Sequence, residues 1–172
     1  AETNFLWPQT QFAAQLAYNS LLGQGISPED ILVLSDAPTM SSFGNLVLDP
    51  GIVDEDANRE KMEWALTEWA TDPNDPASEV MLYMVDHGGP GRFLINESSY
   101  VTSEELSDWV DELQLKGNVD SMAIVYDACQ SGSFLPDLAP PPDKERIMVV
   151  STTNDEPALF ASRGNVSFSS VF

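Results

Sequence analysis

The chain has few basic side chains and almost no cysteine or histidine. Its 172 residues include one cysteine, one histidine and seven lysines and arginines, against 28 aspartates and glutamates, which gives a formal net charge of −21. A single cysteine excludes an internal disulfide bond and leaves the redox compartment open. The negative charge excludes nucleic acid as a partner and argues against anionic membranes, since both are negatively charged themselves. The acidic residues form no block of like charge, so we interpret them as a solvated surface.

Long apolar runs are missing as well. No stretch approaches the ~18 apolar residues of a membrane-spanning helix, so no membrane insertion is expected. The first twenty residues contain several glutamines and asparagines and no basic segment, which excludes a typical signal peptide. The chain begins at Ala1 rather than at a methionine, which fits a processed product or a segment of a longer protein. Its length suits a single domain over residues 1–172 with a core of its own.

The remaining pattern alternates apolar runs with helical segments. Four runs bounded by turn residues predict buried strands, at residues 31–34, 80–85, 122–126 and 147–150. Helices are predicted over 8–22, over 56–70 with Asp56 as cap, and from Thr102 or Ser103 onward, where Glu105 is placed for a capping box. This alternation predicts an α/β domain with a mostly parallel sheet covered on both faces.

The histidine and the cysteine each follow one of these predicted strands. His87 lies in Met-Val-Asp-His-Gly-Gly-Pro-Gly (84–91), and Cys129 lies in Val-Tyr-Asp-Ala-Cys-Gln-Ser-Gly-Ser (125–133). Because parallel strands end at the same edge of a sheet, both side chains are expected at the edge where open α/β sheets carry their sites. A thiol beside an imidazole is the minimum set for nucleophilic catalysis, since the imidazole can take up the thiol proton.

These residues predict a cysteine hydrolase. His87 would accept the thiol proton and later donate it to the leaving amine. Gly88 leaves its N–H open toward a bound carbonyl oxygen, and with the N–H of Cys129 it would form an oxyanion hole, where each donor contributes roughly 3–4 kcal/mol. Asp86 and Asp127 precede the two residues and are interpreted as structural acceptors rather than catalysts.

A metal site is not expected. The acidic residues Asp49, Asp54, Glu55 and Asp56 lack the spacing of a calcium-binding loop, and acids near a helix N-terminus are favourable without a metal. No cofactor is predicted.

The two segments around His87 and Cys129 resemble those of the legumain family of cysteine peptidases (peptidase family C13, clan CD), above all its bacterial members. They are more distantly similar to the caspases, which share a His-Gly and an Ala-Cys at successive strand ends. The similarity runs over nearly the whole chain, from Asn4-Phe5 to 167–169. It implies a caspase-like three-layer α/β/α fold, an endopeptidase that acts on peptide or protein substrates, and a Cys-His dyad without a metal.

The resemblance also implies further site residues. Asn4 matches an asparagine near the catalytic histidine that could orient its ring. Leu6 stands where legumains carry the arginine of the specificity pocket, Gln130 replaces a glutamate, and Asn165 falls near a pocket aspartate. With these charges gone, we expect a pocket for a neutral, small polar residue, with Leu6 and Trp7 opposite a wall formed by the loop from Thr152 to Asn165.

The family sheet has a central strand before the segment that matches Asn4-Phe5, and only three residues precede Asn4 here. We therefore expect the domain to lack its first central strand and to have the remaining segments of a longer chain as partners. The compartment stays open, with an exported or extracellular bacterial protein favoured.

Two other functions remain open. The resemblance extends to the transamidase that attaches glycolipid anchors, so an amine could replace water as the acceptor. The chain could also be a non-catalytic, caspase-like interaction domain, although a scaffold has no use for a Cys-His pair.

Overall fold

The computed structural model describes residues 7–35, 50–96, 98–117, 119–159 and 168. The chain divides into two compact units, one made of residues 1–58 with 159–172 and the other of residues 59–158. The single domain expected from the sequence stays a prediction.

The first unit contains helix α1 (Trp7–Gly23), as predicted, and the short 3₁₀ turns η1 (Pro28–Asp30) and η2 (Pro50–Ile52). The strand predicted over 31–34 is wrong, because only Leu34 forms a bridge, in parallel with Glu55. The reason lies in the hydrogen bonds of Val33. Its N–H donates to the Asp54 carboxylate at 2.8 Å, so this group does not pair with a neighbouring strand.

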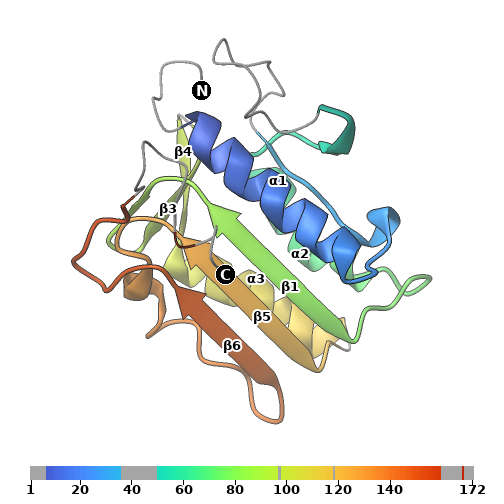
Figure 1. The fold of residues 1–172 in the computed structure, drawn as a ribbon. Coiled ribbons are helices and arrows are strands. Elements are labelled where there is room, and N and C mark those ends of the chain that lie inside the picture. The colour runs from blue at the N-terminus through green and yellow to red at the C-terminus, as the bar shows by residue number, and fades with distance from the viewer. Residues whose placement is uncertain (1–6, 36–49, 97, 118, 160–167, 169–172) are drawn as a thin grey trace. The chain divides into compact units, whose positions relative to one another are not determined.

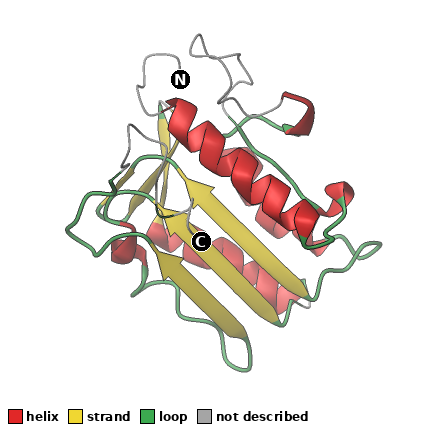
Figure 2. Cartoon of the chain, viewed as in Figure 1, coloured by secondary structure: helices red, strands yellow, loops and turns green. Residues whose placement is uncertain are grey.

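The second unit is built on a parallel sheet, drawn as arrows in Figures 1 and 2. Its strands β1 (Glu79–Val85), β5 (Ser121–Asp127) and β6 (Glu145–Val150) lie in the order β1-β5-β6. Their positions agree with the predicted apolar runs to within two residues at each end, but the burial predicted for 147–150 is wrong, because no residue of β6 is buried and Ile147 is 67% exposed. A mostly parallel sheet accompanied by helices is the predicted α/β class and is consistent with a caspase-like fold.

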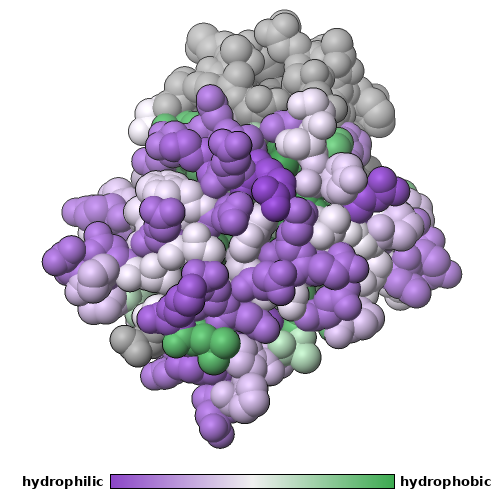
Figure 3. Space-filling model, turned by 180° about the vertical axis from the view of Figure 1, so that it is seen from behind, coloured by the Kyte–Doolittle hydropathy of each residue, from purple (hydrophilic) through white to green (hydrophobic). Residues whose placement is uncertain are grey.

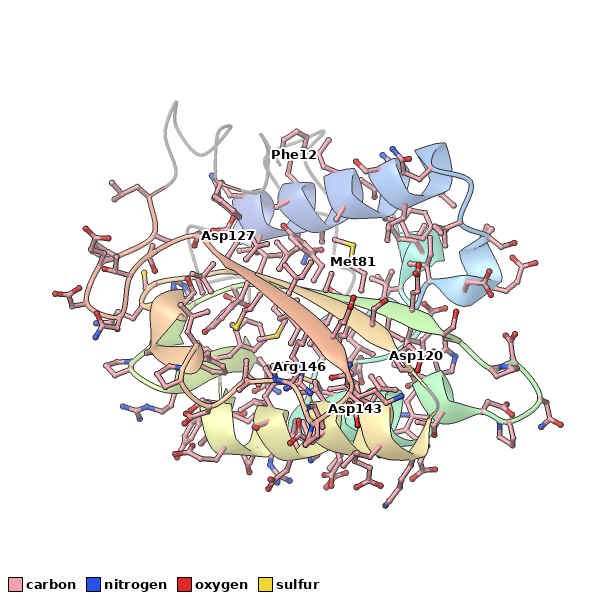
Figure 4. All side chains as sticks on the ribbon, turned by 90° about the horizontal axis from the view of Figure 1, so that it is seen from below. Phe12, Met81, Asp120, Asp127, Asp143 and Arg146 are labelled. Atoms are coloured by element: carbon pink, nitrogen blue, oxygen red, sulfur yellow. The ribbon has the colours of Figure 1, made fainter. Side chains whose placement is uncertain are left out.

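Helix α3 (Ser103–Lys116) packs against one face of this sheet (Figure 4). The predicted capping box starts it: Thr102 Oγ1 accepts the N–H of Glu105, and the Glu105 carboxylate accepts the N–H of Thr102 at 3.0 Å. The core between helix and sheet consists of buried side chains that alternate along the strands and repeat along the helix, namely Met84, Met122, Ile124, Tyr126, Leu106, Trp109, Val110 and Leu113. Burial of each large apolar side chain contributes roughly 1.5–3 kcal/mol.

A buried arginine joins β6 to the same helix. The Arg146 side chain is fully buried and lies between the sheet and α3 in Figure 4. Its guanidinium donates to Asp111 Oδ1 and Gln114 Oε1, both at 2.7 Å, and to the carbonyl oxygens of Leu138 and Ala139. The buried charge is therefore fully hydrogen-bonded, as it must be to remain stable in the core.

Helix α2 (Arg59–Thr67) is shorter than predicted and is followed by a separate 3₁₀ turn, η3 (Trp69–Thr71). It begins at Arg59, three residues after the predicted cap Asp56, and the N–H groups of Asp54 and Glu55 before it donate to the carbonyl oxygen of Val33. Near its end, the hydroxyls of Thr67 and Thr71 donate to carbonyl oxygens one turn earlier, a pattern that weakens a regular helix.

A small antiparallel sheet connects β1 to α3. It consists of β2 (Gly88–Gly89), β3 (Arg92–Asn96) and β4 (Ser99–Thr102). The side of the molecule on which α3 lies is mainly hydrophilic (Figure 3). None of the helices in the described ranges is long and apolar enough to cross a membrane.

Candidate active site

The parallel register of β1 and β5 brings the two predicted segments to one edge. Val85, the last residue of β1, pairs with Asp127, the last residue of β5. From this pair the chain continues to His87 on one side and to Cys129 on the other. The edge predicted for both residues is thus confirmed at the level of the backbone.

Gly88 lies directly against the cysteine segment. A β-carbon placed on Gly88 would be 2.2 Å from the carbonyl oxygen of Cys129 and 2.9 Å from the β-carbon of Ala128. Atoms do not approach so closely, so a side chain at this position would push the two segments apart. Glycine is therefore the residue that lets the backbone after His87 contact the backbone of Cys129.

The backbone of His87 is held by hydrogen bonds at both its N–H and its carbonyl oxygen. The Asp86 carboxylate accepts the N–H of His87 at 2.7 Å, which confirms the structural role predicted for Asp86. The carbonyl oxygen of His87 accepts the N–H of Leu94 at 2.9 Å, so β3 holds the histidine from the other side. The side chains of His87 and Cys129 are both half-buried, a degree of exposure that suits residues meant to meet a ligand.

The chain turns sharply directly after the cysteine. Gln130 has the left-handed conformation, with φ 58° and ψ 26°, and the 3₁₀ turn η4 (Ser131–Phe134) follows. Gly132 lets the turn pack closely against the chain after β6, because a β-carbon there would be 2.8 Å from the carbonyl oxygen of Thr152.

Residues 151–158 form a loop beside the cysteine. Thr152 Oγ1 donates to the carbonyl oxygen of Ala128 at 3.1 Å and accepts the N–H of Ser131 at 3.0 Å. Further along, the carbonyl oxygen of Glu156 accepts the N–H of Gln130 at 2.8 Å. The N–H of Ala158 then donates to Cys129 Sγ at 3.3 Å. The loop thus runs alongside the cysteine and directs a backbone donor at its sulfur.

The His87 and Cys129 segments and the loop over 151–158 fall inside one family match. The profile of the Peptidase C13 family matches residues 69–168, which include β1, β5 and everything described around Cys129. The chain belongs to the peptidase C13 family.

The individual relatives match this C13 chain at low identity and over short segments. A vacuolar-processing enzyme of Citrus sinensis is 36% identical over 62 residues, which are 36% of this chain and 12% of the relative. One of Vicia sativa is 30% identical over 84 residues, 49% of this chain and 16% of the relative. A GPI-anchor transamidase of Bos taurus is 30% identical over 61 residues, 36% of this chain and 15% of the relative. The matched segments are thus a small part of each relative, and these plant and mammalian proteins leave the expected bacterial type unconfirmed.

The other predicted residues of the C13 site are placed as follows. Gln130 and Thr152 are next to Cys129, although the Thr152 hydroxyl is engaged by the backbone of its neighbours. Asn4, Leu6 and Asn165 lie outside the described residues. Trp7 is the first residue of α1, in the other unit.

Two groups near the cysteine were not predicted. The Ala158 N–H is a backbone donor, which leaves no trace in the residue type. The second group is the hydroxyl of Tyr126. Apart from Ser121 at the start of β5, no other residue of this strand carries a hydroxyl. A polar group in a strand predicted to be buried was the signal that could have revealed it. No group of three or more potential metal ligands occurs among the residues that the structure describes.

Proposed function

We propose that this C13 family member is a cysteine endopeptidase in which Cys129 is the nucleophile and His87 the general acid and base. The observation that carries the proposal is the contact of Gly88 with Cys129, because it brings the backbone after His87 against the backbone of Cys129. The chain has one histidine and one cysteine, so no other residue can supply either group.

In this mechanism His87 takes the proton from the Cys129 thiol. The sulfur attacks the carbonyl carbon of the peptide bond, and the oxyanion is stabilised by the N–H groups of Gly88 and Cys129. His87 returns the proton to the leaving amine as the C–N bond breaks, which leaves a thioester on Cys129. Water, deprotonated by His87, then attacks the thioester carbonyl and releases the acid and the free thiol.

The vacuolar-processing enzymes among the relatives support a proteolytic reaction, and the GPI-anchor transamidase supports a second candidate. A transamidase would use the same thioester but pass the acyl group to an amine instead of water. The third candidate, a non-catalytic interaction domain, predicts that the thiol has no special reactivity.

For the specificity we propose a neutral, small polar residue before the cleaved bond rather than strict asparagine or aspartate. Leu6 replaces the arginine that a legumain-type pocket uses for an acidic side chain, and burying a carboxylate without a partner would cost several kcal/mol. A cleavage profile over a mixed peptide library tests this, and exclusive cleavage after asparagine or aspartate would contradict it.

The reaction itself is tested with a peptide that carries a thiol-directed warhead, together with a fluorogenic peptide library. We expect the wild-type protein to be labelled at Cys129 and to cleave peptides, and Cys129→Ala and His87→Ala to lose turnover while staying folded. Ser107→Ala is a control for the loss of one hydroxyl, which here bonds to the Asp137 carbonyl oxygen. Turnover by Cys129→Ala at the wild-type rate would overturn the mechanism. A coupled product on addition of a peptide amine would favour the transamidase, and an unlabelled wild-type protein the interaction domain.

A further inference from the structure

Two hydroxyl groups connect the chain after His87 to the chain around Cys129. The hairpin formed by β2 and β3 (88–96) follows His87 directly. Tyr126 Oη, on β5, donates to the carbonyl oxygen of Arg92 at 3.3 Å. Ser133 Oγ, in the turn η4, accepts the N–H of Gly91 at 2.9 Å and donates to the carbonyl oxygen of Gln130 at 2.6 Å. Both bonds cross between segments more than thirty residues apart in the chain.

The Tyr126 hydroxyl is held in one place by its ring. The side chain is fully buried between the rings of Phe93 and Phe134, with centroids 5.5 Å and 4.9 Å away in edge-on contacts. A β-carbon on Gly88 would lie 3.0 Å from the hydroxyl oxygen, so the hydroxyl also borders the glycine after His87. Burial, with the nearby Cys129 and Asp86, raises the pKa of Tyr126 above its usual value, and the group stays a donor at neutral pH.

The turn at Gly91 is held from both sides. Its N–H donates to Ser133 Oγ. Its carbonyl oxygen accepts the N–H of Ser103, at the start of α3, at 3.2 Å. Gly91 has φ 61°, a left-handed conformation that favours glycine. The tip of the hairpin therefore has few ways to move relative to η4.

We propose that the hydroxyls of Tyr126 and Ser133 are a clamp that positions Gly88 and His87 against Cys129. Neither hydroxyl is assigned to the reacting atoms, so both are positioning residues, and the inference rests on the proposed function. Since a misplacement of ~1 Å can lower a rate by about 10²-fold, loss of the clamp should affect catalysis much more than folding.

The single histidine provides a readout that does not depend on activity. The imidazole signals of ¹⁵N-histidine-labelled protein come from His87 alone. We expect Tyr126→Phe and Ser133→Ala to shift or broaden these signals, and Ser133→Thr, which keeps the hydroxyl, to restore them. Ser107→Ala removes a comparable hydroxyl bond to a carbonyl oxygen, at 2.7 Å, and should leave the His87 signals unchanged.

Kinetics of the same variants give the second readout. We expect kcat to fall about tenfold or more in each single variant and further in the double variant, with KM nearly constant and Tm close to that of Ser107→Ala. Unchanged His87 signals in both variants, or kcat within twofold of an active wild type, would overturn the clamp and leave the proposed function standing. A wild-type protein without turnover or labelling would overturn the proposed function, and the His87 signals would still decide for or against the clamp.

Discussion

Gly88 approaches Cys129 so closely that the glycine cannot carry a side chain: its β-carbon would lie 2.2 Å from the carbonyl oxygen of the cysteine. The atom that it would meet belongs to the backbone, so a rotamer change cannot relieve the overlap. The segments that carry His87 and Cys129 are thus in contact through their main chains, and the geometry between thiol and imidazole depends on this contact.

Gly88→Ala should therefore reduce both stability and activity. Overpacking of this kind lowers the free energy of unfolding by roughly 1–3 kcal/mol, and the displaced segments should lower kcat still further. The neighbouring Gly89→Ala is the matched control, because its β-carbon would come no closer than 3.9 Å to another group, the Gln130 side chain. Urea denaturation and peptide turnover measure the two effects, and equal losses in both variants would contradict the interpretation.

The Ala158 N–H should increase the reactivity of the cysteine, since it donates to Sγ at 3.3 Å. Ala158→Pro removes this donor, whereas Ala158→Ser keeps it. We expect the alkylation rate of Cys129 by iodoacetamide at neutral pH to fall about tenfold in the proline variant, in line with ~1.5 kcal/mol for a hydrogen bond to a charged group. The serine variant should react like the wild type, and a similar loss in both would exclude a role for the N–H.

The charge of Glu105 should stabilise the fold only above acidic pH. The N–H of Thr102, and then the Arg59 guanidinium at 2.7 Å, lower the pKa of this carboxylate, against the opposing effect of burial. A lowered pKa in the folded state gives stability that is present above the unfolded pKa of ~4.3 and is lost as the pH falls through the folded value.

Glu105→Gln tests this dependence, because the amide keeps an acceptor for Thr102 and removes the charge. We expect the variant to be less stable at neutral pH, by under about 1 kcal/mol since the pair with Arg59 is partly exposed, and the difference to shrink as the pH falls below the unfolded pKa. Urea titrations at several pH values measure it, and a difference that stays constant with pH would contradict the assignment.

Arg146→Met should be more destabilising than the same substitution at Lys144, whose carboxylate partner is mostly exposed. The substitution removes the donors that bond to Asp111 and Gln114 and leaves the buried Gln114 Oε1 without them, for a loss of roughly 1–3 kcal/mol in the free energy of unfolding. Lys144→Met, whose partner Asp120 is 81% exposed, should lose less than ~1 kcal/mol. Comparable losses would mean that the Arg146 network contributes little.

The features that could be predicted from the sequence are those set by local pattern. The apolar runs of β1, β5 and β6 fix the three strands, of which β5 is mostly buried, and Thr102 with Glu105 fixes the start of α3 through two local hydrogen bonds. Because β1 and β5 are parallel, the placement of His87 and Cys129 at one edge followed from the same pattern.

The features that could not be predicted depend on partners distant in sequence. The segment 31–34 has the composition of a strand, but the N–H of Val33 is taken by a carboxylate twenty-one residues away. The turn after the cysteine lies at Gln130 because its N–H pairs with Glu156, and the donor on Sγ comes from Ala158. Backbone groups of this kind carry no residue-type signature, so only the folded chain reveals them.

The paired ends of β1 and β5 make chain length itself part of the site. Deleting one residue between Ser121 and Tyr126 would draw Cys129 back by ~3.3 Å and reverse the faces to which the following side chains point. The loop over 72–76, by contrast, is exposed throughout and can lengthen without changing the register. We therefore expect insertions and deletions that preserve function to occur in the loop before β1. We expect none inside β1 or β5.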